Sequence, residues 1–164
     1  MLLNRTVIYT LRALTSLSLQ QEKEQSRLSA RELSDETNIP QHYLSKIMRS
    51  LVSEGIVDGM KGHGGGFALA VQPRELFLSA IFTAVQFELK IDTCVFDWNH
   101  CSNENPCPLH NYWKGFREEW QSWAALTSLQ DLLDGNLDSR YHRLTRRYLS
   151  NEQQLPQEML ELGG

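Results

Sequence analysis

Residues 40–55 read PQHYLSKIMRSLVSEG, and their apolar positions recur at steps of three and four. Such spacing predicts an amphipathic helix that buries one face. Pro40 suits the first helical position and Gly55 suits the end, because proline needs no helical donor and glycine accepts a left-handed turn. The polar face carries donors and cations suited to bases and phosphates, namely Gln41, His42, Ser45, Lys46 and Arg49. A DNA-reading helix needs such a face, although any surface helix also has a solvated one.

A second helix is predicted just upstream of the first. Ser29 followed three residues later by Glu32 is the signature of a capping box, and Asn38 can end the helix in a left-handed turn. About four residues, 37–40, then separate the two helices, which is the spacing of a helix-turn-helix. Arg31 of this upstream helix joins the candidate DNA-binding residues.

The next residues change from helical to strand character. Segments 56–61 and 67–70 carry β-branched and aromatic residues, and they flank the glycine loop GHGGG at 62–66. A hairpin directly after a helix-turn-helix is a wing, and it favours DNA reading over a merely solvated helix face. Lys61 and His63 are its candidate DNA contacts, because a cation on a narrow loop reaches a minor groove or a phosphate. The alternative, a nucleotide-binding loop, lacks the phosphate-binding lysine and hydroxyl, and no helix begins right after it.

Helical spacing also marks residues 3–19, 73–89 and 108–134, the last as one helix of about 25 residues. The aromatic stripe of this long helix predicts packing in a core or a dimer interface, and its members are Trp113, Phe116, Trp120 and Trp123. The expected fold is mainly α with a small β-hairpin wing. We expect a winged helix-turn-helix DNA-binding domain at 1–74, a linking helix and cysteine loop at 75–107, a dimerisation helix at 108–134, and a polar, partly mobile tail at 135–164.

Charge and hydropathy narrow the class of protein. The net charge is −4, but residues 1–74 hold nine Lys/Arg and seven Asp/Glu, whereas residues 75–164 hold seven and thirteen. A slightly basic front half and an acidic rear half suit a DNA-contacting module joined to a sensing or oligomerising one. The sequence contains no membrane-spanning apolar run, no signal peptide and no catalytic motif. We therefore expect a cytoplasmic protein that is not an enzyme.

All three cysteines, Cys94, Cys101 and Cys107, fall within one polar loop. An odd number of clustered cysteines argues against a disulfide framework and favours metal binding or redox chemistry. Paired Cys-x-x-Cys knuckles, the common zinc signature, are absent, and the wider spacing suits an iron–sulfur cluster better than one tetrahedral zinc. Three unliganded cysteines are the plain alternative, although cysteines without ligands usually lie in cores.

A cluster on three cysteines needs a fourth ligand, and His110 is the first candidate because it lies two residues beyond Cys107. The competing candidates are His100, Asp97, Glu104 and a group from a partner subunit, and His110 could instead be a capping or surface residue. The histidine favours a [2Fe–2S] cluster, with [4Fe–4S] as the alternative.

Three motifs together resemble the Rrf-type winged-helix transcriptional regulators, the family that includes IscR and NsrR. The N-terminal helix contains YTLRAL at 9–14, the helix and wing run from IPQHYL at 39–44 to KGHGGGF at 61–67, and CPLHNYW occupies 107–113. The last motif is similar to the Cys-x-x-His-x-x-Trp of the IscR branch, which is the closest in motif. The similarity covers residues 3–134.

The resemblance implies a homodimer that binds double-stranded DNA, in which the long helix crosses its twin and the cluster lies near the partner's DNA-binding domain. It implies that His110 is a ligand, and that His42, Ser45, Lys46 and Lys61 match DNA-contacting positions. Four departures accompany it. Ile8 replaces the carboxylate of the nitric-oxide-sensing branch, the interval from Cys94 to Cys101 is one residue longer, and His63 replaces a common proline. Ser45 and Lys46 replace Glu and Gln, which predicts a different operator.

The residues and the resemblance predict a DNA-binding regulator whose cluster state responds to iron, redox poise, oxygen or nitric oxide. Two alternatives stay open. The cysteines could form a cluster-free thiol switch or a zinc site in a regulator of the same fold. The winged helix could instead bind protein, which a salt titration of DNA binding discriminates because phosphate contacts release counterions.

Overall fold

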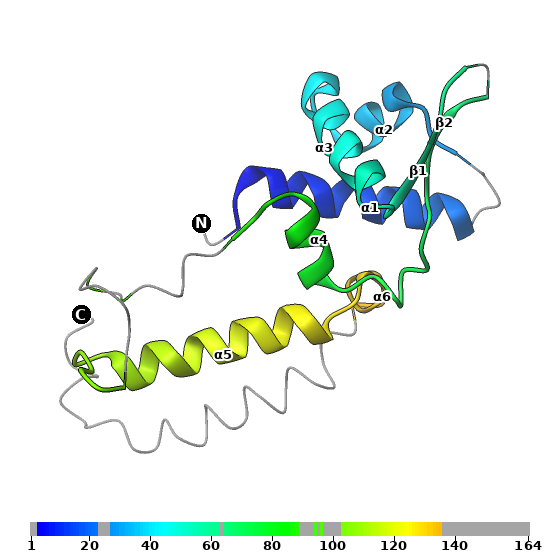
Figure 1. The fold of residues 1–164 in the computed structure, drawn as a ribbon. Helices are drawn as coiled ribbons and strands as arrows, with labels where there is room; N and C mark the ends of the chain where they lie inside the picture. Colours follow the sequence, from blue (N-terminus) through cyan, green and yellow to red (C-terminus); the bar gives the residue numbers. More distant parts are fainter. Residues whose placement is uncertain are drawn as a thin grey trace, which may run out of the picture.

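The structure is a computed structural model that describes residues 3–22, 27–62, 64–88, 94, 96 and 103–135. Six helices and one antiparallel hairpin are described within these ranges, as Figure 1 shows. They are α1 (Arg5–Glu22), α2 (Ala30–Thr37), α3 (Gln41–Ser53), β1 (Val57–Met60), β2 (Gly66–Leu69), α4 (Leu78–Ala84), α5 (His110–Leu126) and α6 (Leu129–Leu133). The predicted fold class, mainly α with a hairpin wing, is confirmed.

The helix-turn-helix forms where the capping signals place it. The Ser29 hydroxyl accepts a hydrogen bond from the Glu32 amide at 3.2 Å, and the Glu32 carboxylate accepts one from the Ser29 amide at 2.8 Å. The Glu32 carboxylate is stabilised in its charged form by hydrogen bonding to the Ser29 side chain and, to a smaller extent, to the Ser29 amide, and this holds the pKa of Glu32 below its usual value. Asn38 ends α2 in the left-handed region, with φ 54° and ψ 37°. The helix α3 begins at Gln41, because Pro40 has an extended ψ of 130° and lies one position before the first helical residue.

The part of the core that supports α3 lies between this helix, α1 and α2, and the same core continues to α4, α5 and α6. The apolar stripe of α3 is buried there, and edge-to-face packing of Tyr9 on Tyr43, with ring centroids 5.4 Å apart, joins α1 to α3. The fully buried side chains include Leu14, Leu33, Leu44, Met48 and Leu51. Because burial of one such side chain stabilises the fold by about 1.5–3 kcal/mol, this packing fixes how α3 is presented to solvent.

The hairpin is anchored to the start of α2. Its register pairs Val57 with Leu69 and Met60 with Gly66. Leu28, just before α2, exchanges two backbone hydrogen bonds with Phe67, at 3.0 and 2.7 Å. The side chain of Arg27 also pairs with Asp58 of β1. The wing therefore moves with the helix-turn-helix rather than independently of it.

The helix predicted at 73–89 is shorter than expected, because only Leu78–Ala84 is helical. Residues 73–75 form a turn and Phe77 is extended directly before the helix, with Leu76 and Leu78 buried and Phe77 exposed between them. Phe77 pairs with Ser128 in an isolated antiparallel bridge, in which the Leu78 amide donates to the Thr127 carbonyl and the Leu129 amide to the Leu76 carbonyl, at 2.9 and 2.8 Å. Alternating burial marks a strand-like segment, and the helical spacing in this part of the sequence was misleading.

The single helix predicted at 108–134 is also wrong, because the structure has α5, a break and α6. Pro108 lies in a turn before α5, and Thr127 is extended with φ −95° and ψ 117°. Ser128 then caps α6, since its hydroxyl accepts from the Asp131 amide and the Asp131 carboxylate accepts from the Ser128 amide. This second capping box and the bridge to Phe77 together outweigh the apolar periodicity. At the N-terminus the error is smaller, because α1 runs three residues beyond the predicted end.

A strained residue ends α4 and provides a stability test. Gln86 has φ 52°, and two hydrogen bonds close the turn, Gln86 amide to Thr83 carbonyl and Phe87 amide to Phe82 carbonyl, both 2.9 Å. This arrangement normally places glycine at the left-handed position. We expect Gln86→Gly to raise the free energy of unfolding by about 0.5–1 kcal/mol in urea denaturation, because it relieves the strain. Gln72→Gly, an exposed position without positive φ, is the matched control and should lower stability; equal losses in both variants would contradict the prediction.

Candidate nucleic-acid interface and cysteine site

The exposed face of α3 unites most of the predicted DNA-binding residues. Leu44, Ile47 and Met48 turn inward on this helix and are buried. The polar residues that alternate with them are all exposed, namely Gln41, His42, Ser45, Lys46 and Arg49. The Ser45 hydroxyl donates to the Gln41 carbonyl at 2.8 Å, so its oxygen remains directed along the helix surface. The helix offers two cations and several donors on one surface, which is the composition that DNA contacts use.

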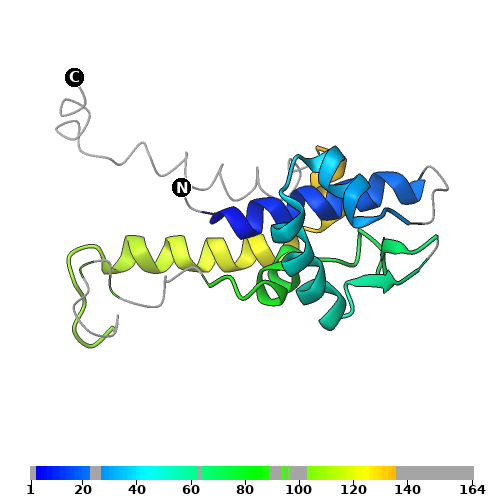
Figure 2. The same ribbon diagram turned by 90° about the horizontal axis from the view of Figure 1, so that it is seen from above.

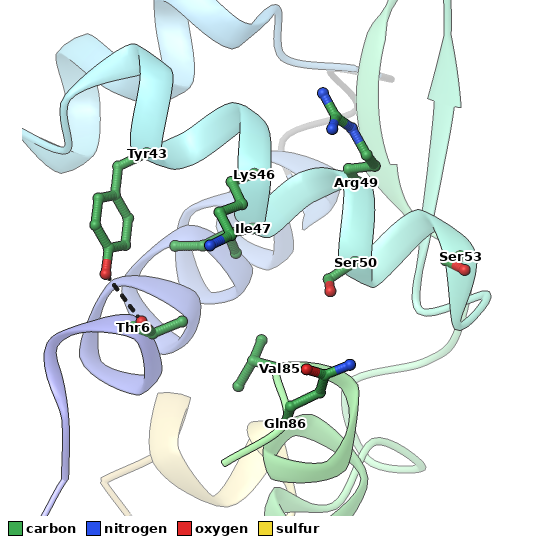
Figure 3. A pocket seen from close by; sticks show the side chains of 9 residues that line it. All are labelled: Thr6, Tyr43, Lys46, Ile47, Arg49, Ser50, Ser53, Val85 and Gln86. Atoms are coloured by element: carbon green, nitrogen blue, oxygen red, sulfur yellow. Dashed lines mark hydrogen bonds between the residues drawn. The ribbon is translucent and has the colours of Figure 1, made fainter.

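A cavity of about 480 Å³ lies beside this face, where α3 approaches the start of α1 and the end of α4. Figure 3 shows Thr6 of α1 hydrogen-bonded to Tyr43 of α3, with hydroxyl oxygens 3.0 Å apart, and Val85 and Gln86 on the opposite side. Its lining contains two cations and four hydroxyl groups but no carboxylate: Thr6, Tyr43, Lys46, Ile47, Arg49, Ser50, Ser53, Val85 and Gln86. Such a lining is compatible with a phosphate oxygen and unfavourable for a cation.

The wing and α2 hold the other predicted contacts. Lys61 is exposed directly after β1, and His63 falls outside the described residues. Arg31 is exposed on α2 and lies 3.9 Å from Asp35 one turn later, at the limit of an ion pair. Because both side chains are strongly solvated, that pair contributes little and leaves the guanidinium available.

Some lining residues of the cavity were absent from the sequence-based prediction. Ser50 and Ser53 lie four and seven residues beyond Lys46, so helical spacing places them on the same side of α3 and could have identified them. Thr6 and Gln86 reach the cavity only through tertiary packing, and no local pattern marks them.

The cysteine segment is described in part. Cys94 is buried and Cys107 is half-buried, whereas Cys101, His100 and Asp97 lie outside the described residues. Of the competing fourth ligands, Glu104 is exposed to solvent. Within the described ranges no three His, Cys, Asp or Glu side chains are grouped closely enough to hold a metal ion. The described part of the chain therefore supplies two of the three predicted thiols and the predicted histidine.

His110 begins α5 and is only 4% exposed. Its backbone amide donates to the Cys107 carbonyl at 2.9 Å, which closes the turn that joins the two residues. Its ring nitrogen Nε2 lies 2.9 Å from Oδ1 of Asn103. The imidazole is thus a buried and oriented group at the edge of the cysteine segment, rather than a solvated surface residue.

The aromatic stripe of α5 divides into two parts. Trp120 and Trp123 pack on Phe82 of α4, with centroids 6.0 and 6.3 Å away, so this part belongs to the core of one chain. Trp113 stacks on Phe116 nearer the start of α5, at 5.5 Å. Figures 1 and 2 show α5 extending beyond α4, away from the wing. The role of these four side chains in a dimer stays a prediction.

Two further features of α5 bear on that prediction. Tyr112 is 70% exposed near the start of the helix, where α5 extends past α4. Partial burial raises the pKa of Glu119 above its usual value, so this carboxylate is already partly desolvated on the helix.

No helix in the described part of the chain is long and apolar enough to cross a membrane.

Comparisons with known proteins agree with this architecture. Residues 3–135 match the family described as "Rrf2: Iron-dependent Transcriptional regulator". A helix-turn-helix transcriptional regulator predicted in Aquifex aeolicus is 29% identical, over 82% of this chain and 92% of that protein. IscR of Yersinia pseudotuberculosis is 26% identical, over 80% of both chains.

Two solved structures share the fold. CymR of B. subtilis, described as the global cysteine regulator, superposes with a TM-score of 0.66 at 19% identity, over 82% of this chain and 97% of that one. IscR of T. potens gives a TM-score of 0.63 at 18% identity, over 83% and 88%. At these identities the two structures show the fold alone. The ligand chemistry has to be argued from the residues of this chain.

Proposed function

The chain belongs to the Rrf2 family of DNA-binding transcriptional regulators and is not an enzyme, and from that premise we propose that it is a cytoplasmic homodimer whose operator binding is controlled by an iron–sulfur cluster. The observation that carries the DNA-binding part is the polar face of α3, which is exposed between an anchored wing and the cavity beside Lys46. Gln41 and His42 supply donors for base edges and the Ser45 oxygen supplies an acceptor, while Lys46, Arg49 and Lys61 neutralise phosphates.

The donor set supports a cluster. Three thiols and one imidazole are the ligands that soft iron centres prefer, and Cys94 and His110 are shielded from water. The group would be held by Cys94, Cys101, Cys107 and His110, and when bound it would supply a centre whose gain, loss or oxidation state changes the charge and geometry of the segment. The histidine favours [2Fe–2S] over [4Fe–4S], and Ile8 offers no carboxylate from α1.

In the sequence, this segment begins close to residues that line the cavity beside the reading helix. Val85 and Gln86 line that cavity, and Cys94 follows eight residues after Gln86. At the other end of the segment α5 packs on α4 through Trp120 and Phe82. A change in the segment can therefore reach the C-terminal end of α4 from both directions, and binding to DNA responds if the two cluster states favour different positions of α3 in the dimer.

A thiol-based regulator is the second candidate, favoured by the structural similarity to a cysteine regulator. In that case Cys94, Cys101 or Cys107 would change redox state directly, and DNA binding would respond to oxidant without iron. A zinc site on the same residues would bring one zinc per chain.

Anaerobic purification followed by native mass spectrometry tests the cluster and the dimer together. We expect a dimer with one cluster per chain, visible absorption and equimolar iron and sulfide for [2Fe–2S]. Cys107→Ser should retain the dimer and lose the cluster, because a hydroxyl is a poor ligand for soft iron. A colourless wild-type protein after reconstitution would contradict the cluster, and zinc or oxidant-dependent DNA release would then favour the alternative.

A salt titration of binding to the protein's own promoter region tests the DNA interface independently of the cluster. The logarithm of the affinity should fall linearly with the logarithm of salt concentration, because phosphate contacts release counterions. Failure to bind at low salt in either cluster state would favour a winged helix that binds protein instead.

A further inference from the structure

The hydrogen bond between Asn103 and His110 has a direction that chemistry dictates. An amide Oδ1 accepts hydrogen bonds and cannot donate them, so His110 Nε2, 2.9 Å away, must carry the proton. In a neutral imidazole the other nitrogen, Nδ1, then holds the lone pair. The bond thus selects which nitrogen of this buried ring can act as a ligand.

We propose that Asn103 is a positioning residue that presents Nδ1 of His110 to the cluster, an inference that rests on the proposed cluster function. Two contacts fix the ring relative to the cysteine segment. The His110 amide is held by the Cys107 carbonyl at 2.9 Å, and Nε2 is held by Asn103. Asn103 itself lies between Cys101 and Cys107 in the sequence, so its bond to the ring joins His110 to the segment that carries the thiols.

Such an acceptor has two physical consequences for a ligating histidine. It fixes the tautomer and the ring orientation, and it raises the basicity of the ligating nitrogen. Without it, Nε2 would lose the acceptor that holds the proton there, and the two tautomers would become closer in free energy. The His110 residue is only 4% exposed whereas Asn103 is exposed, so this acceptor lies at the solvent edge of a buried ring.

The tautomer can be tested in the metal-free protein, where no cluster is needed. Nitrogen-15 NMR of histidine-labelled, reduced protein in mildly alkaline buffer should show the His110 ring protonated at Nε2, with His110→Gln supplying the assignment. In Asn103→Ala this preference should weaken. A wild-type ring protonated at Nδ1 would overturn the proposal whether or not the protein binds iron.

Cluster retention provides the second test, on the full chain reconstituted anaerobically. We expect Asn103→Ala to lose the cluster to a chelator about 10–100-fold faster than wild type, the usual loss when a ligand's outer partner is removed. Asn103→Asp keeps an acceptor and should restore retention. Asn111→Ala, an exposed asparagine beside His110, is the matched control and should behave as wild type.

Pulsed EPR of the reduced cluster identifies the ligating atom. Protein labelled with nitrogen-15 at histidine Nδ1 alone should show the strong hyperfine coupling of a directly bound nitrogen. Strong coupling from Nε2 would overturn the role of Asn103. Equal cluster retention in Asn103→Ala and Asn111→Ala, with the cluster lost in His110→Ala, would overturn it as well. Both outcomes would leave the cluster proposal standing. A wild-type protein without any cluster would overturn the cluster proposal instead, and with it this role, although the tautomer result would stand.

Discussion

Alanine at position 66 should detach the wing from the helix-turn-helix. Gly66 has φ 152°, and a Cβ there would lie 2.5 Å from the Leu28 carbonyl oxygen, a backbone atom that no rotamer change can move aside. The substitution also forces a side chain into a conformation that L-residues rarely adopt. We expect Gly66→Ala to lower the free energy of unfolding by about 3 kcal/mol, from strain and overlap together.

Urea denaturation measures this loss, and the loop supplies a matched control. Gly64 also has a positive φ, 74°, but a Cβ there meets no atom within 4 Å. Gly64→Ala should therefore cost only the backbone term, about 1–2 kcal/mol. Equal free energies of unfolding in the two variants would mean that the close approach of Gly66 to Leu28 does not affect stability. The wing would then not be anchored through the bridge between Leu28 and Phe67.

Reversing the charge at position 46 should cost about 100-fold in DNA affinity for a dimer at physiological salt. Lys46 is exposed on the reading face and lines the cavity, which contains no carboxylate. Lys46→Glu replaces a phosphate or base contact by repulsion in each protomer. The salt dependence of binding should also become shallower by about one counterion per protomer.

Arg74→Glu makes the same change in net charge at an exposed turn after β2, outside the proposed interface. This variant should lower DNA affinity far less, because salt screens a charge that does not contact the DNA. Fluorescence anisotropy with promoter DNA at several salt concentrations measures both variants. Equal losses in the two would mean that Lys46 acts only through the overall field, and the assignment of α3 as the reading helix would fail.

The local signals in the sequence predict the DNA-reading part of the fold well. The capping residues Ser29 and Glu32, the left-handed Asn38 and the apolar stripe of α3 each act over a few residues, and the structure forms what each one favours. The exposed face of α3 follows from the same stripe, because the side chains between buried positions must turn to solvent.

Features that depend on distant partners were mispredicted or missed. The break at Thr127 had a local signal, Ser128 followed by Asp131, but the bridge to Phe77 lies some fifty residues away along the chain and is invisible to periodicity. The same holds for Gln86, which only tertiary packing brings beside α3. Asn103 and His110 are seven residues apart, and the irregular turn that joins them has no periodic pattern either. Long-range contacts therefore limited both the fold prediction and the site prediction.

The bridge between Phe77 and Ser128 joins the two ends of the chain segment 78–127. This bridge consists of the hydrogen bonds Leu78 amide to Thr127 carbonyl and Leu129 amide to Leu76 carbonyl. Because the bridge holds the two ends of this segment together, the segment can unfold locally while the winged helix stays folded. The amides of α5, which lies within this segment, should then open at lower free energy than those of α1 and α3, and hydrogen exchange measures the difference.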